Sequence, residues 1–148
     1  MNSNTRLLFP GLAGFYAATG PLAYALLRAV IGIIIFVHGW GKLASGHAGV
    51  ATFFGKLGLP APDLLAYCAM FLETAGAACI VIGLFTRFFA AALAIEMLIA
   101  LLAVHLAKGF GVGHGGYEYV LLIGIVLFSI AIQGGGRYSV DAKIGQEL

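Results

Sequence analysis

The sequence predicts an all-α membrane protein, with four transmembrane helices in an antiparallel bundle and a short N-terminal interfacial segment. Of its 148 residues, 61% are hydrophobic and only 9% are charged, whereas soluble domains carry about a quarter charged residues. The mean hydropathy is +1.03. Four separate apolar stretches approach the roughly 20 residues that a helix needs to cross a bilayer. These observations exclude a water-soluble globule and indicate a single membrane domain.

The first two predicted spans cover residues 21–43 and 62–85. Both begin at a proline, a residue that suits the first turn of a helix because its missing N–H is unpaired there anyway. We expect Thr19-Gly20-Pro21 to end any helix upstream. Residues 1–20 are therefore interpreted as an interfacial segment, and a fifth span is the alternative.

The third and fourth predicted spans cover residues 87–107 and 117–133. Thr86 is the expected N-cap of the third span, because its side chain can accept a hydrogen bond from the first turn. Three glycines end the fourth span, and the domain closes near residue 141 with a cytoplasmic tail at 142–148.

Two connections between the spans also carry a pattern. Apolar residues at helical spacing within 44–59 predict a short helix on the membrane surface. The connection 108–116 holds five glycines and is expected to be mobile or closely approached by a ligand.

Basic residues predict the orientation of the bundle. With four spans both termini lie on the same side, and the positive-inside rule favours the side with more Lys and Arg as cytoplasmic. That side holds Arg6, Arg87, Arg137 and Lys143, and the other holds Lys42, Lys56 and Lys108. We expect both termini to be cytoplasmic.

Three ionisable residues, Arg28, Glu73 and Glu96, fall near the middle of the predicted spans. Charges in lipid are costly, so such residues face the bundle interior and pair or take up protons. One interpretation is a structural ion pair of Arg28 with Glu96 or Glu73. The other is a proton path, because two acids and one Arg leave a carboxylate without a full partner and burial favours its neutral form.

A second set, His38, His105 and Glu118, is expected near the outer face. These are ligand types of a transition-metal site, but they come from three helices without local spacing. A quinone pocket is the favoured alternative, with histidines bonding its carbonyls and aromatic walls that include Trp40. Interfacial histidines and an aromatic belt are the plain interpretation. Glu96 and His105 are nine residues apart, on opposite sides of a helix, and share a site only if the span bends.

Other chemistries have little support. Cys68 and Cys79 are eleven residues apart, roughly 16 Å along a helix, which is too far for a disulfide, so we expect inert packing residues. There is no basic run with interleaved aromatics, so no nucleic-acid partner is expected.

Several short motifs together resemble the DoxX family of small bacterial membrane proteins. They are Arg28-x3-Gly32-x3-Phe36-x-His38-Gly39-x2-Lys42-Leu43, Glu73 with Gly76, Gly83-Leu84-x-Thr86-Arg87, His105-x3-Gly109 and Gly136-Arg137-Tyr138-Ser139-x-Asp141. The resemblance implies a four-helix bundle in the cytoplasmic membrane. It also implies a link to quinone or thiol chemistry, since relatives are named for a thiosulfate:quinone oxidoreductase subunit. By position, Arg28, His38, Lys42, Glu73, Arg87 and His105 match the family pattern.

Three functions follow as hypotheses. The first is a redox-linked membrane subunit that binds a quinone at the level of His38, His105 and Glu118, with Trp40 and Lys42 as further candidates, and passes protons through Glu73. The second is a non-catalytic anchor or assembly subunit for a soluble oxidoreductase. The third is a small proton-coupled transporter, which the absence of repeats disfavours unless the chain forms a homo-oligomer.

Overall fold

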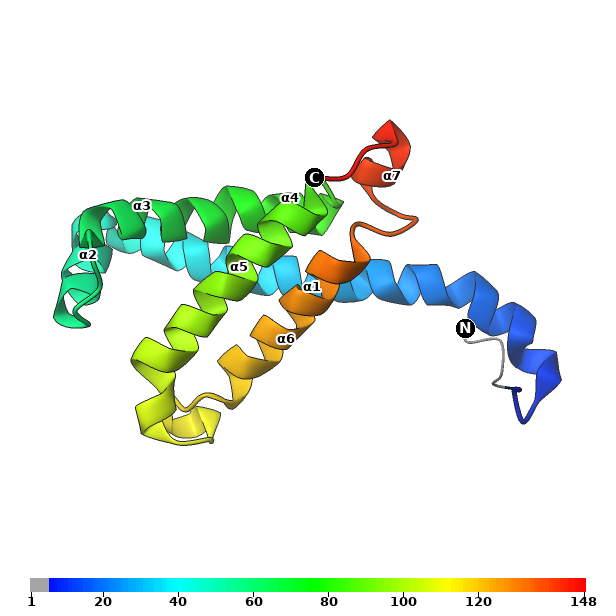
Figure 1. Ribbon diagram of the computed structural model, residues 1–148, viewed down its shortest axis with the longest axis horizontal. Coiled ribbons are helices and arrows are strands. Elements are labelled where there is room, and N and C mark those ends of the chain that lie inside the picture. The colour runs from blue at the N-terminus through cyan, green and yellow to red at the C-terminus, as the bar shows by residue number, and fades with distance from the viewer. Residues whose placement is uncertain (1–5) are drawn as a thin grey trace.

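The computed structural model describes residues 6–148, which form helices joined by short turns (Figure 1). Residues 1–5 of the predicted interfacial segment lie outside the described part of the chain. A one-turn 3-10 helix, Pro10–Leu12, leads into α1, and a second one, Val112–His114, lies in the glycine-rich connection. The α-helices are α1 (Ala13–Ser45), α2 (His47–Lys56), α3 (Pro62–Phe71), α4 (Ala77–Ile82), α5 (Thr86–Ala100), α6 (Glu118–Gln133) and α7 (Val140–Ile144).

Two of the long helices contain a stretch of π-helix. The first, Leu72–Gly76, joins α3 to α4, and the second, Leu101–His105, extends α5 and is followed by a 3-10 turn at Leu106–Lys108. A π-turn holds one residue more than an α-turn, so the residues beyond it are rotated about the helix axis. This rotation changes which side chains beyond the π-turn face the neighbouring helices.

Three apolar helical stretches are long enough to cross a membrane: Pro10–Ser45, Pro62–Ile82 and Thr86–Lys108, with 36, 21 and 23 residues. The membrane character read from the composition is thereby confirmed. Helix α6 has 16 residues, which gives a length of about 24 Å, less than the hydrocarbon core of about 30 Å. The fourth span of the predicted bundle stays a prediction.

The expected break before Pro21 is wrong, because α1 runs through this residue from Ala13. A proline costs one backbone hydrogen bond, but a full break in an apolar environment would leave several backbone groups unpaired. The hydroxyl of Thr19 also donates to the carbonyl of Phe15, at 2.8 Å. The position of residues 13–20 relative to the membrane interface stays a prediction.

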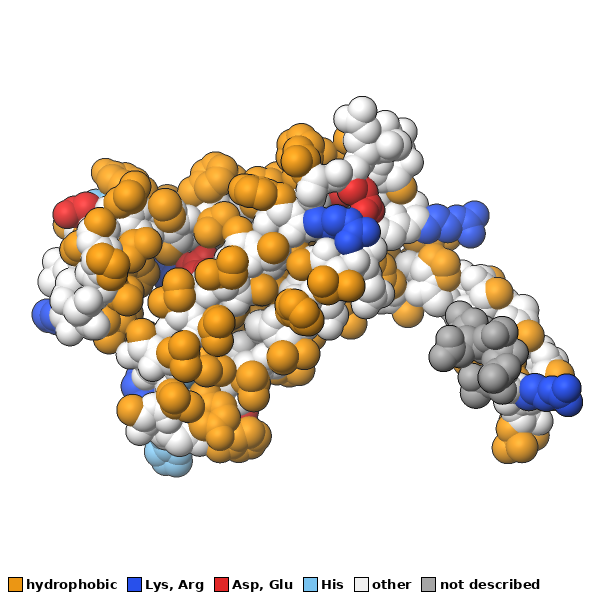
Figure 2. Space-filling model, in the orientation of Figure 1, with side chains coloured by type: hydrophobic (Ala, Val, Ile, Leu, Met, Phe, Trp, Pro, Cys, Tyr) orange, Lys and Arg blue, Asp and Glu red, His pale blue; other side chains and the backbone are white. Residues whose placement is uncertain are grey.

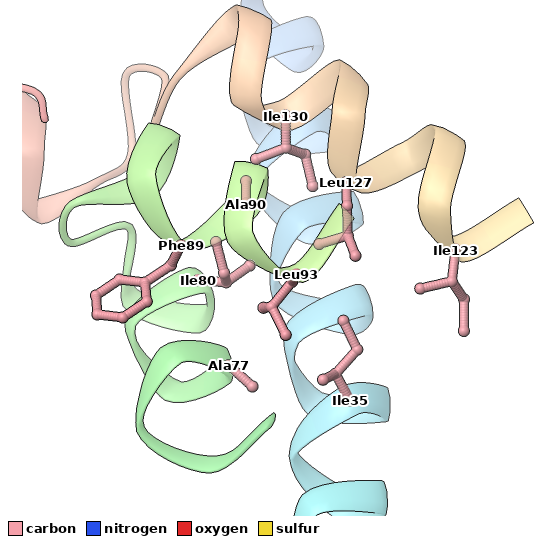
Figure 3. Close-up of a cluster of buried hydrophobic side chains, with 9 residues drawn as sticks. All are labelled: Ile35, Ala77, Ile80, Phe89, Ala90, Leu93, Ile123, Leu127 and Ile130. Atoms are coloured by element: carbon pink, nitrogen blue, oxygen red, sulfur yellow. The ribbon is translucent and has the colours of Figure 1, made fainter. Parts of the chain in front are cut away.

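The helices pack as two adjoining pairs (Figure 1). Helix α1 lies along α3 and α4, while α5 and α6 form an antiparallel pair that crosses them. The two pairs meet in a core of small, branched and aromatic side chains (Figure 3): Ile35, Ala77, Ile80, Phe89, Ala90, Leu93, Ile123, Leu127 and Ile130. Hydrophobic side chains also cover much of the visible outer face (Figure 2), as expected where lipid is the solvent.

The predicted helix in the first connection is confirmed as α2. Val50 and Ala51 on α2 pack against Ala66 and Met70 of α3 in a second, smaller core. Gly46 and Gly58, which flank α2, both have positive φ, 85° and 73°, a conformation that glycine adopts without strain. Helix α2 therefore folds back over the end of α3.

The start of α5 differs from the prediction. Thr86 is its first residue rather than its N-cap, and the capping acceptor comes from the C-terminal segment. The carboxylate of Asp141 accepts hydrogen bonds from the backbone N–H groups of Phe85 and Thr86, at 2.8 and 2.9 Å, and from the Thr86 hydroxyl, at 2.6 Å. The C-terminal segment is thus fixed to the α4–α5 turn.

Candidate functional site

A cavity of about 820 Å³ lies among α1, α2, α3, α5, the π-helix after α5, and α6. Its volume is in the range of small-molecule sites. Most of its lining is apolar, including Ile35, Phe53 and Leu72. Five side chains that can carry charge also line it: His38, Lys42, Glu73, Glu96 and His105.

Lys42 holds two carboxyl groups together. Its Nζ lies 2.5 Å from Oε1 of Glu73 and 3.9 Å from Oε1 of Glu96. The side chains of Glu73 and Glu96 are only 6% and 16% exposed. Oε2 of each is buried and has no hydrogen-bond partner among the described residues. Two acids therefore share one cation in an apolar environment.

Close packing of α1 on the first π-helix creates this arrangement. Gly39 lies one helical turn before Lys42, on the same face of α1. A Cβ at Gly39 would stand 2.5 Å from the carbonyl oxygen of Glu73, so only glycine allows this approach. Glu73 belongs to the π-helix Leu72–Gly76 and is buried against α1. The ion pair thus depends on a glycine in one helix and a π-turn in the other.

The second π-helix brings His105 to the cavity that Glu96 also lines. The sequence analysis places these residues on opposite sides of a regular α-helix, and the π-turn supplies the required change of direction. Nδ1 of His105 lies 2.7 Å from the carbonyl oxygen of Gly115. Because a carbonyl oxygen only accepts, Nδ1 is the protonated donor, and Nε2 of the neutral ring is an acceptor.

Arg28 lies outside the cavity, and its expected pairing with Glu73 or Glu96 is wrong. Its guanidinium donates to the backbone carbonyls of Ile80, Val81 and Tyr138. Arg28 precedes Lys42 by 14 residues on α1, which corresponds to about 21 Å of helix. A position near the middle of a predicted span did not place Arg28 beside the acids, because α1 begins before Pro21 and α5 crosses α1 at an angle.

Two other candidates also point elsewhere. Trp40 is 62% exposed and stacks on Phe36, with ring centroids 6.2 Å apart, and neither residue lines the cavity. Glu118 accepts a hydrogen bond at 2.7 Å from the backbone N–H of Val112 and so fixes the glycine-rich connection. Trp40 and Glu118 therefore make local structural contacts and are not part of the candidate site.

The minority hypothesis of a metal site at His38, His105 and Glu118 is not supported. Across residues 6–148, no group of three or more His, Cys, Asp or Glu side chains is placed to hold a metal ion. His38 and His105 both line the cavity, whereas Glu118 does not.

Sequence reasoning missed two features of the cavity. Lys42 was counted among the outer basic residues and named as a candidate for binding the ligand, but it was not paired with the acids, although Gly39 one turn earlier is a signal of close helix approach at that face. Cys68, expected to be an inert packing residue, is exposed and lines the cavity.

Comparison with known proteins places the chain in a family. The sequence model of the DoxX family matches residues 23–106, more than half of the chain. The chain belongs to the DoxX family. This match contains His38, Lys42, Glu73, Glu96 and His105 of the cavity, whereas Glu118 and the C-terminal segment lie outside it.

Three relatives extend this result. A Bacillus subtilis (strain 168) protein named "Putative oxidoreductase CatD" is 37% identical over 98 residues, covering 66% of this chain and 70% of its own. An uncharacterized Haemophilus influenzae protein is 30% identical over 127 residues, covering 83% and 91%. The Escherichia coli (strain K12) inner membrane protein YphA is 32% identical over 72 residues, covering 49% and 51%. No solved structure matches the chain.

Proposed function

We propose that this DoxX protein is an integral membrane subunit of a redox-linked system and binds a quinone-like ligand in the cavity. The observation that carries the proposal is a mostly apolar cavity of about 820 Å³ whose lining includes Lys42 and the two largely buried acids Glu73 and Glu96. A flat amphipathic ligand needs both parts, an apolar wall for the ring and polar groups for its oxygens. The name of the Bacillus relative CatD supports a redox role.

The charged cluster also suits proton handling. Two carboxyl groups close to a single ammonium in an apolar environment favour a state in which one of them carries a proton. A ligand that gains or loses protons would find a partner there. In this proposal Lys42 takes the place that the sequence analysis gave to Arg28, and Glu73 and Glu96 remain the proton-carrying groups.

Location and orientation are part of the same proposal. YphA is named as an inner membrane protein, and the basic residues favour cytoplasmic termini. The protein would then sit in the bacterial inner membrane with the cavity end of α1 toward the outside.

A non-catalytic anchor for a soluble oxidoreductase is the second candidate. It is favoured by the first third of α1, which projects beyond the other helices (Figure 1) and exposes Phe15, Tyr16 and Leu22. Large exposed apolar surfaces often mark contacts with another protein or with lipid.

Binding of a short-tailed benzoquinone to the purified protein, measured by titration calorimetry in lipid nanodiscs, tests the first proposal. Ala103 lines the cavity and is exposed to it, so Ala103→Phe fills the space that the ring would occupy. Ala78 is exposed on α4, outside the cavity, and Ala78→Phe is the matched control.

We expect saturable binding that Ala103→Phe weakens at least about tenfold and Ala78→Phe leaves unchanged. Equal binding by both variants, or none by the unchanged protein, would overturn the proposal. Co-purification of a soluble oxidoreductase together with an empty cavity would favour the anchor.

A further inference from the structure

The cavity lies between two arms of the molecule (Figure 1). One arm holds α2, α3 and the end of α1, and the other holds the later part of α5, the connection 108–116 and the start of α6. Helices α3 and α5 meet where the rings of Phe71 and Phe89 have centroids 6.3 Å apart, and beyond this contact they diverge. The charged cluster lies near the narrow end, since Glu73 follows Phe71 by two residues.

The side of the cavity between α3 and α5 has an apolar rim. Cys68 lines the cavity from α3 and is exposed, and Ile99 lines it from α5 and is 44% exposed. Cys68 and Ile99 are three to five residues from the acids on their own helices, about 5–8 Å of helix. Figure 2 shows acidic atoms between α3 and α5, on a face where most visible side chains are hydrophobic. The cavity thus opens onto a surface whose solvent is lipid.

The opposite side, between α1 and α6, has a polar rim. His38 is exposed on α1, Tyr119 is 38% exposed on α6, and both line the cavity. An apolar chain that left the cavity on this side would cover a ring nitrogen and a hydroxyl group, and polar groups are costly to bury without partners. An apolar chain therefore fits better between α3 and α5.

The glycine-rich connection is held by its own hydrogen bonds. Three backbone N–H groups in 116–118 donate to three carbonyls in 109–111, each at 3.0 Å. A Cβ at Gly116 would stand 2.4 Å from the carbonyl oxygen of Gly109, so the turn is closely packed. Because Gly116 also lines the cavity, the connection forms a wall of the cavity and not its entrance.

We propose that the cavity takes a long-tailed amphiphile from the lipid phase, and that the apolar tail of this ligand lies between α3 and α5, against Leu65, Cys68 and Ile99. This inference rests on the proposed function, because it names the class of quinone-like ligand and its path. A volume of about 820 Å³ lies toward the upper end of small-molecule sites and leaves room for part of a tail beside the ring. Lipid is as apolar as the gap, so the tail adds little affinity, and its path is what the protein determines.

A long-tailed quinone with a photoreactive diazirine in the tail, close to the ring, tests this path without any mutation. The probe is irradiated with the protein in lipid nanodiscs, and the labelled residues are identified by mass spectrometry of peptides. A matched sample contains an excess of the same quinone without the diazirine. We expect label at Leu65, Cys68 and Ile99 that this competitor removes. Competitor-sensitive label at His38 and Tyr119 instead would overturn the path.

A variant that narrows the gap gives an independent test. Ile99→Trp adds bulk at the rim, and Leu98→Trp on the same helix is the matched control, because Leu98 is 55% exposed and does not line the cavity. Dissociation constants of a long-tailed and a short-tailed quinone are compared per mole of lipid, so that partition into the bilayer cancels. We expect Ile99→Trp to weaken the long-tailed quinone at least about tenfold and the short-tailed one by less than about threefold. Leu98→Trp should change neither constant.

The outcomes separate this inference from the proposed function. If the short-tailed quinone binds and the long-tailed one does not, the inference is overturned while the proposed function stands. Equal weakening of both quinones by Ile99→Trp, or weakening of neither, also overturns the path between α3 and α5. Label on these helices that the competitor cannot remove comes from the bilayer and overturns it too. Failure of both quinones to bind overturns the proposed function itself.

Discussion

The Lys42 ammonium is the charge on which the buried cluster depends. It lies 2.5 Å from one carboxyl group and 3.9 Å from the other. Taking charges out of water is costly, and removing one partner of a buried pair leaves the other uncompensated. The intact cluster therefore adds little to the free energy of unfolding, compared with the free energy that is lost when its cation is removed.

Lys42→Met should destabilise the protein by about 3–5 kcal/mol when the acids are ionised. Much of this loss should be recovered in the double variant Lys42→Met with Glu73→Gln, which removes the uncompensated charge. The deficit of the single variant should grow as the pH rises, because protonation of the acids at low pH relieves the same charge. Thermal unfolding in detergent over a pH series measures these effects.

Lys56→Met is the control for this prediction, since Lys56 is exposed at the end of α2. It should change stability little at any pH. Strictly additive losses for Lys42→Met and Glu73→Gln would contradict the ion pair.

The charged residues of the membrane interior could be predicted one by one, but their partners could not. Glu73 and Glu96 were identified as interior acids from the sequence, and both are largely buried. Arg28 was expected beside them because it falls near the middle of a span that was predicted to begin at Pro21, whereas α1 begins at Ala13. The carbonyl groups that Arg28 binds come from the end of α4 and from the C-terminal segment, and backbone acceptors cannot be recognised in a sequence.

At the scale of elements, two π-helices decide which side chains face the cavity. Hydrophobic period alone predicts α-helix for these spans, and a regular α-helix separates Glu96 from His105 by half a turn. A π-turn depends on tertiary packing rather than on a local residue pattern, so the sequence could only state that the span must bend. By contrast, the presence of the apolar helices and their approximate bounds could be predicted from the composition and length of the apolar stretches.

Gly39→Ala tests the contact between α1 and the first π-helix. The added methyl group would stand 2.5 Å from the Glu73 carbonyl oxygen and 2.7 Å from the Glu73 Cβ. The helices must then separate, at a cost of about 1–3 kcal/mol, and Glu73 should move from Lys42. We expect a lower thermal midpoint and weaker binding of the quinone-like probe.

The matched control for this contact is Gly41→Ala, on the same helix. A Cβ at Gly41 meets no atom within 4 Å, so this variant should be neutral or more stable by about 0.5–1 kcal/mol, because alanine favours the helix. Equal destabilisation by the two substitutions would contradict the proposed close packing.

At the scale of the whole molecule, the C-terminal segment and the start of α5 lie at the same end of the helix bundle. The backbone N–H of Phe88 donates to the carbonyl of Leu148, at 2.9 Å, and Arg87 forms an ion pair with Glu147, at 2.6 Å. The N-terminal part of α1 leaves the bundle on this side too (Figure 1), since Arg28 contacts the end of α4 and Lys42 contacts the π-helix before it.

This geometry predicts that both termini lie on one side of the membrane even though α6 is short. Arg87, Arg137 and Lys143 gather at that end, whereas Lys42 at the other end is engaged by the acids. The positive-inside rule then makes the terminal end cytoplasmic. A fluorescent reporter that folds only in the cytoplasm should therefore be active at the C-terminus.

A phosphatase active only outside the cytoplasm should be inactive at the C-terminus and active when inserted into the connection at 109–115. That connection follows α5 at the opposite end, and its glycines include positions where an added side chain meets nothing within 4 Å, such as Gly111 and Gly113. Insertion there leaves the packed helices intact. The opposite pattern of activities would show that the orientation is reversed, with the cavity end toward the cytoplasm. Activity of the phosphatase at both sites would show instead that α6 does not cross the bilayer, so this one pair of fusions tests the fourth span together with the orientation.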